Sequence, residues 1–334
     1  SIRRQRQMCI RDRSHAAAYT ITSYRCAYLK THYTSEYLIA LLNAEVRAGA
    51  NVKSSDKGDK TYRKFLLEVE EMGIKLLPPD INKSDVYFVK ESDKGIRYSL
   101  LGIKNVGEAA AEYIVNVRNK TGKFKSFEDF ISRVSSREVN KRVLEALILS
   151  GSLDCLIKDE LTLEDKCRVR KMLINKIEEK NSKDLKQHQL LLTPIEEKQK
   201  DYGQFTEQEI FFHEHQLTEI YWSGHPLQKY IEDIKGFAKY TIAELPSEEV
   251  EVEVIGMVSV IKKFKTQSGQ PWVRFILEDL TDEIEVTVFN KVYEESKNYI
   301  HKNSVVYVKG TISIYEEDKK SIVAEKVSLF EMVK

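Results

Sequence analysis

The sequence predicts a multidomain α+β protein that is helical over most of its length and ends in a five-stranded β-barrel. Three observations support this fold class. Apolar residues recur at helical spacing within the first 72 residues, two glycines bracket a short turn at 102–107, and alternating apolar residues mark the segments after residue 249. The chain has 334 residues, which is enough for roughly two or three domains.

Composition indicates a water-soluble, cytoplasmic protein. Charged residues make up 31% of the chain and hydrophobic residues 42%, with a formal net charge of +1. No apolar run approaches membrane-spanning length and no signal peptide is recognisable, so no membrane association is expected. The four cysteines form no Cys-x-x-Cys pair, and we therefore expect reduced thiols and no zinc site.

The N-terminal region divides into a leader and a helical part. Residues 1–13 are basic and show little apolar periodicity, which indicates either a disordered arm or a foreign junction in an incomplete gene. From residue 14, tyrosines and then leucines at helical spacing predict a helix pair. A polar loop is expected over 51–59, followed by an amphipathic helix over 61–72 that Gly73 ends. The side chains of this helix expected to face the core are Phe65, Leu66 and Val69.

An extended segment follows the helices. Pro78 and Pro79 are incompatible with a helix and force an extended backbone over 74–82. Residues 86–89 and 96–100 then predict a β-hairpin that leads into the glycine turn.

The glycine turn and the alanine-rich helix after it, 109–118, are typical of a helix-hairpin-helix motif. Glycine tolerates positive φ and close backbone approach. Amide groups at the start of the helix would face an anion, which predicts sequence-independent contact with a DNA backbone. The candidate DNA-binding residues are Gly102, Lys104, Val106 and Gly107. The alternative is that the two glycines only cap helices in an ordinary bundle.

A second, looser copy of this pattern runs over 139–148 and contributes Lys141 and Arg142 as candidate DNA-binding residues. Between residues 94 and 153 there are eleven Lys/Arg against six Asp/Glu, a local basic excess. We therefore assign 94–157 to a tandem helix-hairpin-helix domain.

The segment from 158 to 246 is a helical linker. Its apolar residues over 161–179 have the period of an exposed amphipathic helix, and most of its charges are interpreted as solvated. Ser223 and His225 lie close in sequence, but no acid partner is evident, and we interpret them as a turn that docks the linker onto the next domain.

The last domain, 247–334, has the element order of an OB-fold barrel, in which a helix over 291–299 separates the third strand from the fourth. The predicted strands are 250–260, 272–278, 284–289, 304–315 and 321–330. The candidate residues for binding single-stranded DNA, by stacking and phosphate neutralisation, are Lys263, Phe264, Lys265, Trp272 and Arg274. From residue 248 onward there are sixteen acidic and twelve basic residues, so a barrel used for protein contacts stays open as an alternative.

Several ordered motifs resemble the C-terminal portion of the bacterial replicative DNA polymerase III alpha subunit, a C-family polymerase. The resemblance begins at residue 14 and continues to the end of the chain. The matching segments are 14–19, 27–30, 37–42, 78–84, 102–107, 127–130, 140–145 and 221–227.

This resemblance implies that 14–93 is the end of a fingers domain, in which His15 and Tyr19 contact the incoming nucleotide. Position 13 is Arg13 where the family normally has lysine, which is where the match ends. The resemblance also marks Gln187, Leu190 and Leu191 as an internal motif for binding the sliding clamp. The family usually has an aromatic residue in place of Leu191, and a plain helix end is the alternative for this segment.

The family's reaction is template-directed DNA synthesis, a phosphoryl transfer that needs two Mg²⁺ ions held by aspartates. In the family these aspartates lie in the palm domain, and no segment here resembles that motif. We therefore expect this polypeptide alone to be inactive and to bind no cofactor. The implied partners are primer-template DNA, single-stranded DNA, the sliding clamp and other replicase subunits.

Two alternatives belong to other classes. The first is a non-catalytic nucleic-acid-binding or scaffold module. The second is the anticodon-binding region of an aminoacyl-tRNA synthetase, which would explain the barrel but not the tandem hairpins.

Overall fold

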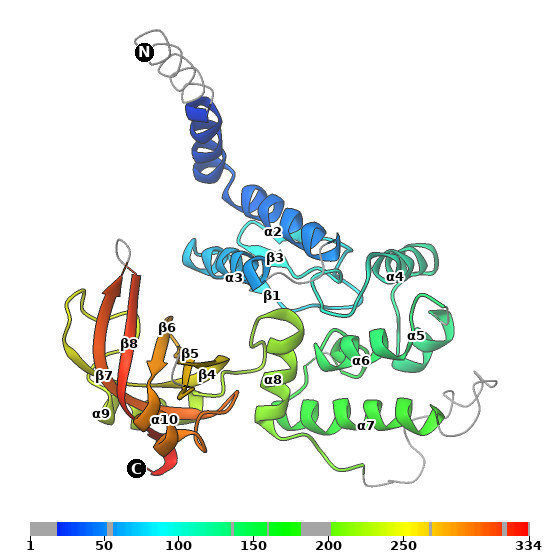
Figure 1. Cartoon of the computed structure of the whole chain (residues 1–334). Helices are drawn as coiled ribbons and strands as arrows, with labels where there is room; N and C mark the ends of the chain where they lie inside the picture. The colour runs from blue at the N-terminus through cyan, green and yellow to red at the C-terminus, as the bar shows by residue number, and fades with distance from the viewer. Residues whose placement is uncertain are drawn as a thin grey trace. The chain divides into compact units, whose positions relative to one another are not determined.

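The computed structural model describes residues 19–51, 56–134, 137–158, 160–181, 202–266, 269–315 and 319–332. The chain forms two compact units, Ser1–Ser223 and Gly224–Lys334, so the boundary lies inside the segment predicted as a linker. The first unit is helical with a small sheet, and the second is a closed β-barrel (Figure 1). The predicted multidomain α+β class is confirmed.

Helices open the first unit. Residues 19–32 are helical, followed by α2 (Thr34–Asn51) and α3 (Asp56–Glu71), which confirms the helix pair and the amphipathic helix. In α3, Leu66 and Val69 are buried, and Gly73 with a φ of +73° follows its end. The predicted polar loop is wrong over 56–59, which already belong to α3. Charged residues suit an exposed helix face as well as a loop, so composition did not separate the two.

A three-stranded sheet comes next, formed by β1 (Lys75–Leu77), β2 (Val89–Ser92) and β3 (Gly95–Arg97). The strand order is β1-β3-β2, with β3 parallel to β1 and antiparallel to β2. The predicted hairpin is therefore present, but its first strand begins at Val89 rather than at residue 86.

The hairpin region contains α4 (Glu108–Thr121), α5 (Phe127–Arg133) and α6 (Lys141–Leu149). Two longer elements follow, α7 (Leu163–Asn181) and α8 (Glu207–Thr218). The apolar faces of α4 to α7 meet in one core together with α2, α3 and the sheet.

The second unit begins with the short helix α9 (Ile231–Phe237) and continues into the barrel. The barrel elements are β4 (Glu251–Lys265), β5 (Pro271–Glu278), β6 (Glu283–Val288), α10 (Asn290–Ser296), β7 (Val305–Tyr315) and β8 (Lys319–Leu329). The strands close in the order β4-β5-β6-β8-β7 around a core of aliphatic side chains and Phe275. Figure 1 shows the barrel in yellow to red. The predicted five-stranded barrel is confirmed.

Strand β4 is longer than predicted, reaching Lys265 instead of residue 260. Its extension pairs with β5, where Phe264 lies opposite Trp272 and Lys262 lies opposite Arg274. The aromatic pair stabilises the ladder beyond the barrel core, whereas the like charges of Lys262 and Arg274 oppose it. Residues 261–265, which lie outside the predicted strand, are therefore part of the sheet.

Candidate nucleic-acid interface

The first hairpin is a series of tight turns between β3 and α4. Ile103 donates its backbone N–H to the carbonyl of Leu100 at 3.2 Å, and Val106 donates to Ile103 at 3.0 Å. Asn105 has a φ of +72°, a conformation that asparagine tolerates better than most residues. The hairpin therefore lacks a regular helix on its N-terminal side, and the turns lead directly into α4.

The two glycines of this hairpin serve different purposes. A Cβ at Gly102 would lie 2.8 Å from the Ser99 Oγ and 2.9 Å from Cε1 of Tyr98, so only glycine fits that packing. Gly107 is the N-cap of α4 with a φ of −78°, and a Cβ there would meet nothing within 4 Å. The two glycines were predicted because glycine tolerates positive φ, but neither of them adopts it. Asn105 is the residue of this turn with a positive φ.

The exposed parts of the first hairpin are Lys104, Asn105 and the start of α4. The first N–H groups of a helix have no intrahelical acceptor, so the start of α4 can bind an anion. Val106 is buried and its N–H is already used, so it shapes the turn and has no free donor. Lys104 is 46% exposed and forms an ion pair with Glu219, which follows α8.

The second hairpin joins α5 to α6. The side chain of Asn140 caps α6 by accepting the N–H of Val143 at 3.1 Å. Lys141 and Arg142 are exposed in the first turn of α6, and Lys141 Nζ lies 3.4 Å from a carboxylate oxygen of Glu145. Arg142 forms no ion pair with the residues that the structure describes. This hairpin therefore presents cationic side chains beside a helix N-terminus.

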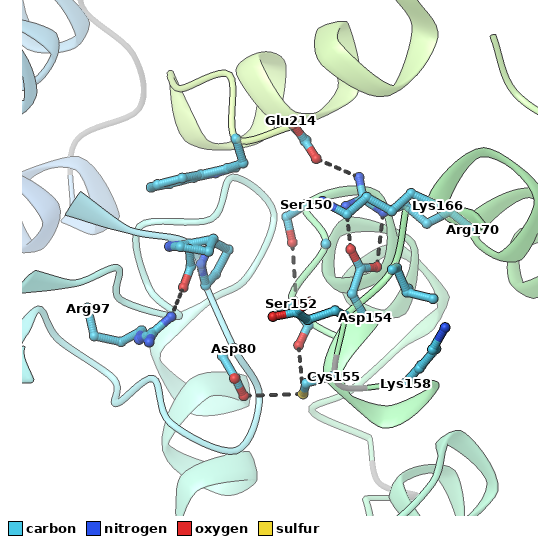
Figure 2. Close-up of a pocket in the computed structure, with 16 residues that line it drawn as sticks. Asp80, Arg97, Ser150, Ser152, Asp154, Cys155, Lys158, Lys166, Arg170 and Glu214 are labelled. Atoms are coloured by element: carbon cyan, nitrogen blue, oxygen red, sulfur yellow. Dashed lines mark hydrogen bonds and ion pairs between the residues drawn. The ribbon is translucent and has the colours of Figure 1, made fainter. Parts of the chain in front are cut away.

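A buried ion cluster, Asp154–Arg170–Glu214, links the chain after α6 to α7 and α8 (Figure 2). Arg170 is 2% exposed and Glu214 is fully buried. Nη1 of Arg170 donates to Glu214 at 2.8 Å, and its Nε donates to Asp154 at 3.0 Å. Burial lowers the pKa of the Arg170 guanidinium, but the two carboxylates outweigh burial and raise it, so the guanidinium stays charged.

The interpretation of 161–179 as a solvated helix is wrong for Arg170. The residue lies three positions after Cys167 and three before Leu173, both of which are buried. Its position on the apolar face of the helix could have predicted that Arg170 is buried and paired, since a charge at such a position needs a buried partner. The partners Asp154 and Glu214 are 16 and 44 residues away, and no spacing rule could identify them.

Ser223 is held by the same cluster. Its N–H and hydroxyl donate to Glu214 at 2.8 and 2.6 Å, and Lys166 Nζ donates to its Oγ at 3.0 Å. In the second unit, Nδ1 of His225 accepts the N–H of Leu227 at 3.1 Å. These contacts fit a structural turn, in which Glu214 holds Ser223 and is already paired with Arg170.

A pocket of about 410 Å³ lies between the loop 150–155 and residues 78–80 (Figure 2). The thiol of Cys155 donates to Asp80 at 3.2 Å, and Arg97 donates to the carbonyl of Pro78 at 2.7 Å. Burial, reinforced by Asp80, raises the pKa of the Cys155 thiol to about 12. The thiol is therefore a hydrogen-bond donor and not a nucleophile at neutral pH.

The outer face of the barrel carries an aromatic patch, defined here as Phe264, Trp272 and Phe289. The rings of Phe264 and Trp272 are stacked, with centroids 4.4 Å apart and planes at 19°. The ring of Phe289 lies 5.7 Å from Trp272. The guanidinium of Arg274 lies 5.5 Å from the Trp272 centroid and forms an ion pair with Glu285 at 3.3 Å.

The five candidate residues for single-stranded DNA divide between the two faces of the sheet. Phe264, Trp272 and Arg274 share the outer face, because residues directly opposite in an antiparallel pair point to the same side. Lys263 and Lys265 alternate with Phe264 and lie on the other side. Two residues that were not predicted lie on the same face as the aromatic patch: Lys262, which is opposite Arg274, and Phe289. The alternation of side chains along β4 and β6 could have predicted this position for both.

The remaining predicted residues are not brought into these sites. Tyr19 is 61% exposed on the first described helix. His15 and the clamp-motif residues Gln187, Leu190 and Leu191 lie outside the described residues. Within the described ranges, no three His, Cys, Asp or Glu side chains gather in a way that could hold a metal ion, and no helix is long and apolar enough to cross a membrane.

Two family models match the regions just described. The model for a helix-hairpin-helix motif matches residues 73–163, and one described as an OB-fold nucleic acid binding domain matches residues 252–330. Fold and family matches together define a nucleic-acid-binding protein with a hairpin region and an OB barrel.

Curated relatives make the assignment more specific. The DNA polymerase III subunit alpha of Borreliella burgdorferi is 33% identical over 95% of this chain and 27% of its own length. That of Aquifex aeolicus is 34% identical over 97% of this chain and 26% of its own length. The chain therefore belongs with the DNA polymerase III alpha subunits and spans about a quarter of the length of the relatives it matches.

Among solved structures, a crystal structure of the mitochondrial single-stranded DNA binding protein Rim1 from S. cerevisiae covers 25% of this chain and 95% of its own, at 15% identity. Its TM-score of 0.23 is too low to support an argument.

Proposed function

We propose that this chain holds DNA for a DNA polymerase III alpha subunit, with duplex bound at the hairpins and single-stranded DNA bound at the barrel. The observation that carries the proposal is the aromatic patch on the outer face of β4, β5 and β6, beside Arg274 and Lys262. In OB folds, this face commonly binds oligonucleotides. Stacked rings with an adjacent cation suit unpaired bases and their phosphates.

The hairpins offer a different chemistry. The helix start at Gly107 and the cations Lys104, Lys141 and Arg142 can contact phosphates through backbone N–H groups and charge, and contacts to phosphate carry no base information. Contact of this kind is independent of sequence, which a polymerase needs if it is to move along its product after each addition. Its affinity should fall steeply with salt, since each neutralised phosphate releases counterions.

The wider role follows from the family. The full-length subunit would carry out template-directed DNA synthesis with Mg²⁺ held by carboxylates in another domain, and this chain alone would be inactive. His15 and Tyr19 would contact the incoming nucleotide, and Gln187 with Leu190 and Leu191 would seat in a pocket of the sliding clamp. Other replicase subunits would be further partners, in the cytoplasm.

A fluorescence-anisotropy titration tests the proposal. The chain is titrated against a primer-template duplex and a single strand at several salt concentrations, and then again as Lys104→Glu. We expect salt-sensitive binding of both DNAs and weaker duplex binding by the variant. Binding to neither DNA would contradict the proposal and favour the alternative of a scaffold module.

A further inference from the structure

The first hairpin is anchored on the C-terminal end of α8, which lies outside the region matched by the helix-hairpin-helix model. The backbone N–H of Lys104 donates to the carbonyl of Leu217 at 2.8 Å. The hydroxyl of Tyr98 lies 2.8 Å from the carbonyl of Thr218 and 3.1 Å from that of Gly102. Because the last carbonyls of a helix lack intrahelical partners, the hairpin serves as the cap of α8.

This anchoring fixes Glu219 beside the hairpin. Glu219 is the C-cap of α8, with a φ of +62° and its N–H bonded to the carbonyl of His215 at 2.8 Å. Its side chain is only 15% exposed and forms an ion pair with the half-exposed Nζ of Lys104. The ion pair therefore joins two side chains whose backbones are already held together.

We propose that Glu219 competes with DNA phosphate for Lys104 and thereby limits how tightly the first hairpin grips duplex. This inference rests on the proposed function. A carboxylate and a phosphate carry the same sign of charge and repel each other, so Lys104 attracts a phosphate less strongly while Glu219 lies beside it. The negative charge of Glu219 near the DNA adds to the cost of binding.

The competition predicts how much Glu219→Gln changes the affinity for duplex DNA and its salt dependence. An exposed or half-exposed ion pair is worth little, so its loss should raise duplex affinity by about 1.4-fold to fivefold. The plot of log affinity against log salt should become steeper by up to about 0.9, the value for one phosphate. Glu219→Asn removes the same charge while favouring the left-handed backbone, and it serves if the glutamine variant folds poorly.

The decisive experiment is a double-mutant cycle on the whole chain, read by anisotropy with a primer-template duplex. The proteins are wild type, Glu219→Gln, Lys104→Gln and the double variant, with thermal melting as a folding check. Glu207→Gln is the matched control, because this exposed glutamate lies in the first turn of the same helix. We expect Glu219→Gln to strengthen binding in the wild-type background, and to give a clearly smaller gain once Lys104 is glutamine, because only the repulsion between Glu219 and the DNA is then relieved.

Other outcomes separate this inference from the function on which it rests. An equal gain in both backgrounds, or the same gain from Glu207→Gln, would show a general charge effect and overturn the competition. Weaker binding by Glu219→Gln would mean that Glu219 positions Lys104 for phosphate, which also overturns it. If Lys104→Gln leaves duplex affinity unchanged, the proposed role of Lys104 itself fails.

Discussion

The hairpin region and the barrel present opposite chemistries to nucleic acid. The hairpins expose a helix N-terminus and Arg142. They also expose Lys104 and Lys141, which form ion pairs with Glu219 and Glu145 respectively. The barrel exposes the aromatic patch with Arg274 at its side. Duplex DNA hides its bases and displays its phosphates, whereas a single strand displays both. The difference teaches that the two regions are suited to different states of the same DNA.

Their interiors also differ. The barrel core is apolar and is closed by strand pairing, while the hairpin region depends on the buried Asp154–Arg170–Glu214 cluster. Removing one member of such a cluster leaves buried charge without a partner, which costs far more than losing a surface ion pair. The two units should therefore respond very differently to a single substitution.

The largest expected effect is that of Arg170→Leu. This substitution leaves the carboxylates of Asp154 and Glu214 without their cation. It should lower the free energy of unfolding of the first unit by about 3–5 kcal/mol while the barrel remains folded. Hydrogen exchange resolves the two units in one sample. Arg168→Leu is the matched control, since the Arg168 side chain is 68% exposed on the same helix. Equal losses of protection in both units would contradict independent stability.

The next effect is that of Trp272→Ala on the aromatic patch. Base stacking on an aromatic ring is worth about 1–3 kcal/mol, so single-strand affinity should fall by that amount while duplex affinity stays unchanged. Anisotropy with an oligothymidine measures this. Phe237→Ala is the control, because Phe237 is 42% exposed but packs against Phe330 instead. A loss equal to that of Phe237→Ala would exclude the patch as a stacking site.

These predictions rest on features that differ in how far sequence revealed them. The barrel followed from alternation, a local pattern that also orders Phe264, Trp272 and Arg274 on one face. The ion pair between Lys104 and Glu219 spans 115 residues, and the partners of Arg170 are also distant in sequence. Periodicity shows which face of an element is buried, but not which polar groups meet there. The hairpin site was therefore only partly predictable.

The smallest expected effect concerns pH and the first unit alone. Burial lowers the pKa of His213, with Glu209 opposing and Arg170 and Lys171 adding to the shift. Below a pH of about 6.5 the unfolded chain binds a proton that the folded unit resists, so stability present above this pH is lost as pH falls. His213→Gln should make the first unit's melting temperature less sensitive to acid below about pH 6.5. An unchanged pH profile would show that His213 titrates normally.

The central claim is that the first unit binds duplex DNA and the barrel binds single-stranded DNA. One titration that crosses both variants with both DNAs tests it most directly. Wild type, Arg142→Glu, Trp272→Ala and the double variant are titrated by anisotropy against a duplex and a single strand of equal length across several salt concentrations. We predict that Arg142→Glu weakens duplex binding and flattens its salt dependence by about one unit, while Trp272→Ala weakens only single-strand binding. If each variant weakened both DNAs to the same degree, the division of labour would be contradicted.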